Sequence, residues 1–453
     1  MKPLVLINVV GLTPRLLQHM PNLSALARQG WQGNLGTVLP AVTCSVQSTF
    51  LTGRMPAEHG IVGNGWYFRE LGEVHLWRQH NGLVQGDKLW DGLKVANLCW
   101  WYAMGANTEL LVTPRPVYHA DGRKSPDCYT RPPSLHDDLT GRLGPFPLFH
   151  YWGPTASITS THWIRRAAQR ILRAERPDLT LVYLPHLDYE LQRYGPESAQ
   201  AVTAAQLVDA ETAPLLAEAE SAGATVVVLS EYGITPVRRP IDINRVLRAE
   251  GLLEVYTQDG MEYLDPWTSR AFAVADHQVA HVYVKDDQDL PRVRDILRQT
   301  PGVDEVLGRA EQARYRLDHE RSGELVVTAD PDAWFTYYYW LDDDRAPDFA
   351  RTVEIHRKPG YDPAELFFDD PVRGRAKAAI ALARKKIGLR YTMNVVPLDP
   401  SGVRGSHGRL PENPLDGPVL LCSDPAIPGW AETGNGLRAT DVRPLVEHLL
   451  RCS

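Results

Sequence analysis

The chain has 453 residues and a formal net charge of -7, and 43% of its residues are hydrophobic. This composition is that of an ordinary folded protein with one large domain or two. The mild negative charge argues against a protein that binds nucleic-acid backbones, since such proteins usually carry a basic face. No apolar run reaches about 18 residues, so we expect no membrane-spanning helix.

Strands and helices alternate along the first 240 residues. Apolar runs and extended segments predict strands at residues 4–10, 98–103, 110–116, 179–184 and 224–230. Amphipathic or Gly-terminated segments predict helices at residues 21–30, 159–175 and 198–221. Continuously apolar strands separated by helices are typical of a doubly wound α/β core with a mostly parallel sheet.

Beyond about residue 240 the pattern changes. Strands are predicted at residues 246–263, 270–285 and 323–329, with a helix at 290–299. A buried strand at 419–423 and a terminal helix at 441–452 then return to the first pattern. We therefore predict a core formed by residues 1–240 and 401–453, and a smaller inserted α+β region at 241–400.

Cysteine usage and the start of the chain favour a cytoplasmic location. The first ten residues hold one Lys and a short apolar run without a small-residue cleavage site, which predicts a strand and not a signal peptide. The five cysteines are odd in number and widely spaced, which favours reduced thiols over disulfides or a CxxC zinc site. They are Cys44, Cys99, Cys128, Cys422 and Cys452.

The strongest functional signal lies in Pro40–Tyr67. Residues 45–51 have helical character, and Gly53 follows where a left-handed residue ends a helix. Thr43 is therefore expected to be the N-cap, with its hydroxyl at the positive end of the helix, where a phosphate group would also bind. On these grounds alone Thr43 is either a simple cap or a nucleophile.

The same segment resembles the type I phosphodiesterases/nucleotide pyrophosphatases of the alkaline phosphatase superfamily. In that family a nucleophilic Thr is followed by a short helix, Thr-Gly, Pro, His-Gly-Ile and an Asn. The matching residues stand in the same order: Thr43, Thr52-Gly53, Pro56, His59-Gly60-Ile61 and Asn64. The resemblance implies an alkaline-phosphatase-like α/β fold, Thr43 as the nucleophile, and Asn64 as a group that holds a phosphate oxygen. The alternative for Asn64 is a turn residue within Gly-Asn-Gly.

The resemblance also implies two metal positions, of which the first is partly kept. In the family it takes an Asp, a His four residues later and a late His in a Gly-rich loop. Asp188 and His407 match, whereas Gln192 stands where the first His is expected. One helical turn keeps Asp188 and Gln192 on one face, and an amide oxygen suits Mg or Ca better than Zn.

The second metal position departs much further from the family. Val10 stands in place of an Asp, and Glu231 and Tyr232 stand in place of an Asp-His pair. Because Val10 cannot bind a metal, we expect the second ion to be absent or held by ligands from elsewhere.

A candidate replacement for the missing ligands is the group Asp276, His277 and His281. If this segment is a strand, His277 and His281 face the same side. The alternative is that these histidines pack or form hydrogen bonds for structural reasons. Cys44, beside Thr43, is likewise either a thiolate nucleophile or a small buried side chain.

We therefore predict a metal-dependent hydrolase of phosphate ester, phosphodiester or pyrophosphate-type bonds, acting on a small phosphorylated substrate. Thr43 would attack phosphorus and form a covalent phosphothreonine. One divalent ion is expected, although Zn, Mg, Mn and Ca are not distinguished and a metal-free protein stays open. Its candidate ligands are Asp188, Gln192, Glu231 and His407.

Two alternatives remain on the sequence. The first is a catalytically degenerate family member that binds a phosphorylated or aromatic small molecule, or a partner protein. The second is a single-metal or metal-free hydrolase of altered chemistry, assisted by Cys44 or Glu231. The natural substrate and the oligomeric state do not follow from the sequence.

Overall fold

The computed structural model describes residues 2–120, 124–370, 393–427 and 436–451, together with Gly374, Ile380 and Ala383. The chain forms two compact units. The first consists of Met1–His59, Gln79–Ile234 and Leu410–Ser453. The second consists of Gly60–Arg78 and Thr235–Arg409, so a short piece taken from within the first predicted core segment packs with the second unit.

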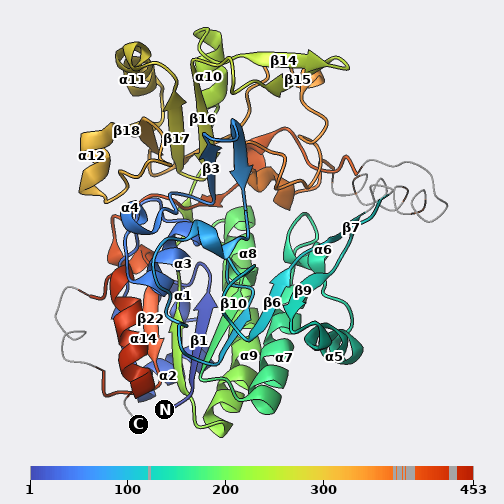
Figure 1. Ribbon diagram of the computed structural model, residues 1–453, viewed down its shortest axis with the longest axis vertical. Coiled ribbons are helices and arrows are strands. Elements are labelled where there is room, and N and C mark those ends of the chain that lie inside the picture. The colour runs from blue at the N-terminus through green and yellow to red at the C-terminus, as the bar shows by residue number, and fades with distance from the viewer. Residues whose placement is uncertain are drawn as a thin grey trace. The chain divides into compact units, whose positions relative to one another are not determined.

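The first unit is built on an eight-stranded sheet with the order β2-β22-β11-β1-β10-β5-β6-β9 (Figure 1). Neighbours from β11 to β6 pair in parallel, whereas β22 and β9 pair antiparallel with the strands beside them. This confirms the mostly parallel α/β sheet. The strands are β1 (Leu4–Val9), β2 (Trp31–Asn34), β5 (Val95–Leu98), β6 (Leu110–Pro114), β9 (Cys128–Arg131), β10 (Leu179–Leu184), β11 (Thr225–Leu229) and β22 (Val419–Cys422).

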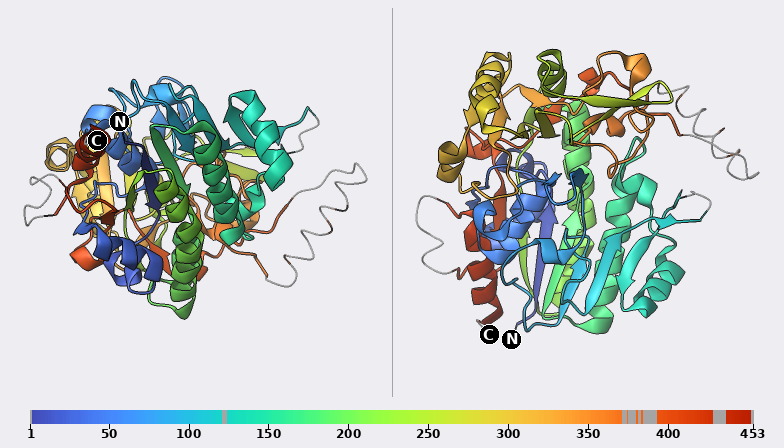
Figure 2. Two further views of the ribbon diagram at one scale, coloured as in Figure 1. Left: turned by 90° about the horizontal axis from the view of Figure 1, so that it is seen from below. Right: turned by 45° about the horizontal axis from the view of Figure 1, so that its top comes forward.

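Helices cover both faces of this sheet, as Figure 2 shows from below. On one face α7 (Ile158–Glu175) packs on β10, and α9 (Ala199–Ser221) packs on β11 and on α2 (Pro21–Gln29). On the other, α14 (Val442–Arg451) packs on β1 and on α3 (Thr43–Thr52). Within the described residues, none of the helices combines the length and apolar character needed to cross a bilayer.

The remaining elements of the first unit are short. A two-stranded ribbon joins β7 (Val117–Tyr118) and β8 (Lys124–Ser125). Its other helices are α1 (Pro14–Leu17), α4 (Pro56–His59), α5 (Pro133–Leu143), α6 (Leu148–Tyr151) and α8 (His186–Tyr194).

The central strands are apolar because both of their faces are covered. Every residue of β1, β10 and β11 is buried, so their side chains show no alternation of apolar and polar types. Asn8 is the exception in β1, since its polar side chain is fully buried and needs a hydrogen-bond partner. That partner, described below, belongs to the candidate site.

The second unit contains a four-stranded antiparallel sheet in the order β16-β17-β19-β18. Tyr67, on the hairpin formed by β3 and β4, packs edge-on against Phe272 and Tyr283 of this sheet. The strands are β3 (Gly65–Phe68), β4 (Glu73–Leu76), β12 (Thr235–Pro236), β13 (Arg239–Ile241), β14 (Val255–Gln258), β15 (Met261–Leu264), β16 (Ala271–Asp276), β17 (Val279–Val284), β18 (Val303–Leu307), β19 (Leu325–Ala329), β20 (Ala333–Phe335) and β21 (Gly405–Ser406). The helices are α10 (Ile243–Ala249), α11 (Leu290–Gln299) and α12 (Arg309–Arg314).

Three predicted strands were wrong in type or extent. Residues 246–263 hold the end of α10 and the β14–β15 hairpin, which turns at Asp259 and Gly260, both with positive φ. Residues 270–285 form the β16–β17 hairpin, with His277 in its turn at φ 60°. The strand predicted at 98–103 instead ends at Leu98, because Cys99 adopts φ 67°. The predicted end of the last helix at Cys452 lies outside the described residues.

Candidate functional site

Thr43 is the first residue of α3 and not its cap. Val42 is the N-cap, with extended dihedral angles of φ -130° and ψ 155° and no side-chain capping bond, so the predicted cap was one residue too late. Gly53 ends the helix in the left-handed conformation at φ 67°, as predicted. The Thr43 side chain is only 4% exposed, so its hydroxyl must find partners inside the protein.

A chain of hydrogen bonds runs from Thr43 to Asp188. The hydroxyl of Thr43 lies 3.1 Å from the phenol oxygen of Tyr232. The Tyr232 hydroxyl donates to Oδ1 of Asp188 over 3.2 Å. With the Tyr232 proton directed at the carboxylate, the Thr43 hydroxyl can donate to the Tyr232 oxygen, and the Thr43 side chain also forms a hydrogen bond with Glu231. The structure therefore joins the predicted nucleophile Thr43 to the predicted metal ligand Asp188. The link is Tyr232, which stands where the family has a metal-binding His.

Asp188 and Gln192 lie one turn apart on α8, as their spacing predicted. The Gln192 amide donates to Oδ2 of Asp188 over 2.8 Å, and both side chains are buried. Burial raises the pKa of Asp188 to about 7, although the hydrogen bonds from Gln192 and Tyr232 oppose this shift. A carboxyl group with a pKa near neutrality can accept or release a proton under physiological conditions.

Glu231 follows β11 and is held by two amides. Asn8 and Gln47 each donate to its Oε1 over 2.6 Å, and the backbone N–H of Trp101 fixes the other end of the Gln47 amide over 2.8 Å. Burial raises the pKa of Glu231 to about 8, so it carries a proton at neutral pH. Glu231 thus acts here as a buried acid within a built polar network.

These raised pKa values predict how stability depends on pH. The folded protein keeps protons on Asp188 and Glu231 that the unfolded chain releases above about pH 4, so stability should fall as pH rises from about 4 to about 8 and then level off. In Glu231→Gln the slope should be smaller, whereas the exposed Glu197→Gln should leave it unchanged. Denaturant unfolding of chelator-treated protein measures this. Equal slopes in wild type and Glu231→Gln would contradict the assignment.

The first unit fits one metal ion but not a second. Asp188 and the Gln192 amide are oxygen donors that suit a hard divalent cation. At the second position Val10 offers no donor and is completely buried, and the Tyr232 hydroxyl is already bonded to Asp188. Glu231 Oε2 and Oδ1 of Asn8, whose amide donates to Glu231, both lack hydrogen-bond partners within the described residues, but these two oxygens fall short of a full set of metal ligands.

Asn64 and His407 belong to the second unit. The Asn64 amide donates to Oδ1 of Asp276 over 3.0 Å, and its backbone N–H donates to Oδ2 over 2.8 Å. Nδ1 of His277 lies 2.8 Å from the same Oδ1, and the His277 ring is 3.7 Å from the His407 ring between centroids. Four residues singled out in the sequence are therefore neighbours within this unit.

His281 uses both of its ring nitrogens in hydrogen bonds to groups other than these four residues. Because residues 270–285 form a hairpin, His281 lies on β17 and pairs with Val274, away from the turn that holds His277. Its Nε2 donates to the carbonyl of Val62 over 2.8 Å, and its Nδ1 accepts the N–H of Gly323 over 3.1 Å. Both ring nitrogens thus have structural partners, which favours the structural alternative for this residue.

Comparison with known proteins decides the family. The family model "Type I phosphodiesterase / nucleotide pyrophosphatase" matches residues 4–362. The chain belongs to this family. The type I phosphodiesterase/nucleotide pyrophosphatase family points to hydrolysis of phosphodiester or pyrophosphate bonds and is typically dependent on divalent metals.

Relatives of this family differ widely in sequence. Ectonucleotide pyrophosphatase/phosphodiesterase family member 3 of Bos taurus is 24% identical over 221 residues, which are 46% of this chain and 21% of that protein. Phosphonoacetate hydrolase from Sinorhizobium meliloti 1021, in complex with phosphonoformate, has a TM-score of 0.62 at 18% identity, covering 99% of this chain and 95% of that one.

A second solved structure is an inactive threonine-to-alanine variant of murine ectonucleotide pyrophosphatase/phosphodiesterase 5 in complex with AMP. Its TM-score is 0.58 at 14% identity, covering 100% of this chain and 96% of that one. At these identities the likeness of both structures establishes the alkaline-phosphatase-like α/β fold.

Two residues of the site were missed in the sequence. Asn8 and Gln47 fix the Glu231 carboxyl, and neither was singled out. Asn8 carried a signal, since it is a lone amide inside an otherwise apolar buried strand. Gln47 carried none, because a Gln within a short helix is ordinary.

Proposed function

We propose that this chain hydrolyses a phosphate ester, phosphodiester or pyrophosphate-type bond in a small phosphorylated molecule, with Thr43 as the nucleophile. The observation that carries the proposal is the hydrogen-bonded series Thr43, Tyr232 and Asp188 at the start of α3. The inactive threonine-to-alanine variant of the murine neighbour supports a threonine nucleophile. A cytoplasmic location, proposed with it, rests on the odd number and wide spacing of the cysteines, which form no disulfide among the described residues.

Tyr232 gives the Thr43 proton a route away from the attacking oxygen. As Thr43 Oγ1 bonds to phosphorus, its proton passes to the Tyr232 oxygen while the Tyr232 proton passes to Oδ1 of Asp188. Without a bound cation, Asp188 is suited to receive it because burial raises its pKa to about 7. Attack forms a phosphothreonine and releases the leaving group, and water then cleaves the phosphothreonine.

One divalent cation completes the proposal. Asp188 and Gln192 would hold it, and it would supply positive charge to a phosphoryl oxygen. His407 and Asn64 stay candidates from the family motif alone, the first as a metal ligand and the second as a group that holds a phosphoryl oxygen. Because Val10 offers no donor, the proposal contains one ion and not two.

The metal-free hydrolase is the second candidate. One observation favours the metal-free enzyme. Both carboxylate oxygens of Asp188 already accept hydrogen bonds, from Gln192 and Tyr232, in the places where a cation would bind. In that case Asp188 serves only as the final proton acceptor. The two candidates differ in one measurable property, which is the effect of a chelator on turnover.

Metal removal is therefore the direct test. We expect the purified protein to hydrolyse bis-p-nitrophenyl phosphate, to lose turnover in a chelator, and to recover it with one of Mg, Mn, Zn or Ca. Asp188→Asn should lower kcat by on the order of 10²-fold or more. Glu190→Gln is the matched control, since Glu190 lies on the same helix and pairs with Arg193.

The possible outcomes distinguish a metal-dependent hydrolase, a metal-free hydrolase and a catalytically degenerate binding protein. Turnover that resists the chelator but is lost in Asp188→Asn would support the metal-free hydrolase. No turnover with any metal, combined with binding of AMP, would support a degenerate binding protein. Unchanged turnover in Asp188→Asn would remove Asp188 from either mechanism.

A further inference from the structure

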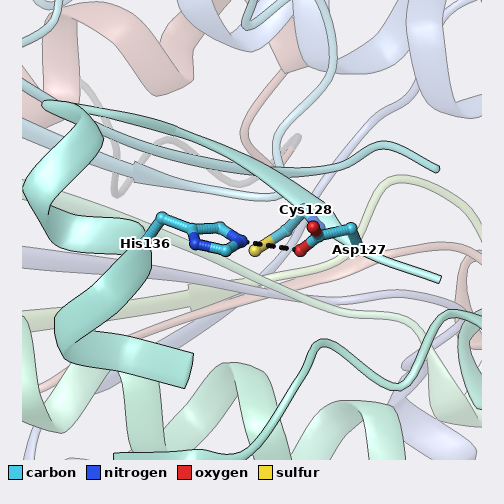
Figure 3. A group of neighbouring side chains, drawn as sticks. All are labelled: Asp127, Cys128 and His136. Atoms are coloured by element: carbon cyan, nitrogen blue, oxygen red, sulfur yellow. Dashed lines mark hydrogen bonds and ion pairs between the residues drawn. The ribbon is translucent and has the colours of Figure 1, made fainter. Parts of the chain in front are cut away.

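A second group of metal-binding side chains lies in the first unit, outside the candidate site. Asp127, Cys128 and His136 each offer one donor atom, and these atoms lie within 4.8 Å of one another. Figure 3 shows the sulfur beside the ring nitrogen of His136 that contacts the Asp127 carboxylate. We propose that these three residues form a site for zinc or a similar borderline-soft divalent cation.

The ligand types select this class of cation. A thiolate, an imidazole and a carboxylate are the three ligand types that Zn²⁺ takes in proteins, whereas Mg²⁺ and Ca²⁺ prefer oxygen. The sulfur of Cys128 is buried and has no hydrogen-bond partner within the described residues, so it is free to bind. The side chains of Asp127 and His136 are 25% and 33% exposed, so water can supply a fourth ligand.

The backbone and a further carboxylate hold the three ligands in place. Cys128 begins β9 and pairs with Pro114 of β6, while His136 lies on α5, which packs against β9. Oδ1 of Asp127 also accepts the backbone N–H of Cys128 over 2.8 Å. Nδ1 of His136 lies 3.5 Å from Oδ1 of Asp137. A carboxylate on the far ring nitrogen is the usual partner of a metal-bound histidine.

A Cys-His nucleophile is the rival for the same residues, and the geometry argues against it. Both ring nitrogens of His136 face carboxylates, at 2.8 Å to Asp127 and 3.5 Å to Asp137, so neither is aimed at the thiol as a base.

Charge balance in the binding step is simple. Zn²⁺ bonds to the Cys128 sulfur, one His136 nitrogen and one Asp127 oxygen. The thiol proton and the proton that His136 shares with Asp127 both leave to solvent, and the cation takes their place. Since β9 is the edge strand of the eight-stranded sheet, the ion would fasten that edge to α5.

Cobalt titration tests the site directly. Untagged protein stripped of metal should develop a thiolate-to-cobalt absorption band on adding Co²⁺, and Zn²⁺ should abolish the band. Cys128→Ala and His136→Ala should each weaken Zn²⁺ binding by about 100-fold or more and lose the band. If Cys128→Ala folds poorly, His136→Ala still tests the site, because the His136 side chain is partly exposed and its removal disturbs the packing less.

Two control variants isolate the proposal from other cysteines and from the candidate catalytic ion. Cys422→Ala removes another buried free cysteine, and Asp188→Asn alters the proposed catalytic site; both should keep the cobalt band. A missing band in wild type, or a band that persists in Cys128→Ala, would overturn the zinc site. Neither result bears on phosphoester hydrolysis, so the two proposals fail separately.

Discussion

Replacing Thr43 by alanine is expected to lower the turnover of bis-p-nitrophenyl phosphate by on the order of 10³-fold or more. The hydroxyl is the atom that would bond to phosphorus, and alanine removes both this oxygen and its contact with the Tyr232 phenol. The fold should survive because alanine favours the first turn of α3. Steady-state rates measure the loss of turnover, and the yield of phosphorylated protein after acid quenching measures the loss of the covalent intermediate.

A matched control lies in the same helix. Thr52 bonds through its hydroxyl to the carbonyl of Ser48 and is also buried, so Thr52→Ala should keep most of the turnover. An equal rate in Thr43→Ala and wild type would exclude the covalent mechanism. If Cys44→Ala abolished turnover instead, the hydrolase of altered chemistry would be supported, although Cys44 is fully buried.

Replacing Lys358 by alanine should destabilise the second unit by about 3–5 kcal/mol, because it leaves two buried carboxylates without their partner. The Lys358 ammonium lies 2.7 Å from Oδ2 of Asp362 and 2.7 Å from Oε1 of Glu365. All three side chains are buried. Denaturant unfolding followed by a probe in this unit gives the free energy.

The neighbouring ion pair provides the control for Lys358. Arg357 pairs with Asp348, and their side chains are 54% and 45% exposed, so Arg357→Ala should cost about 1 kcal/mol or less. The loss in Lys358→Ala should shrink at acidic pH, because burial raises the pKa of Glu365 and protonation removes its charge. A loss that is as small as in Arg357→Ala would refute the buried-triad account.

The sheet could be predicted because its strands are buried on both faces. Residues 179–184 form an uninterrupted apolar run, and the strand was located to the residue. The helix at 198–221 was equally clear, with Ser198 as its side-chain cap. Local composition and tertiary environment agree in these segments, so the sequence alone was sufficient.

The hairpins of the second unit could not be predicted as easily. The turn at Asp259-Gly260 did carry a signal, since Asp-Gly favours a two-residue hairpin turn, whereas His277 is a non-glycine residue at positive φ that a sequence pattern rarely reveals. Both hairpins were nevertheless interpreted as longer strands.

The candidate site was predictable where a motif fixed it. Thr43, Asp188 and Gln192 were named from the family resemblance, and the first unit joins them through hydrogen bonds. The function of Tyr232 was hidden, since the motif describes it only as a missing ligand. Its bonds to both neighbours depend on three-dimensional proximity across 189 and 44 residues of chain.

The division of the chain into interleaved pieces limits how this protein could be dissected. The polypeptide crosses between the two units at residues 59/60, 78/79, 234/235 and 409/410. A deletion of 235–409 alone would remove the aromatic side chains that pack on Tyr67 of the β3–β4 hairpin. The truncated protein would then expose apolar surface and be prone to aggregation and proteolysis. A minimal fragment for crystallography or engineering therefore needs two splices, one of them replacing residues 60–78 with a short linker.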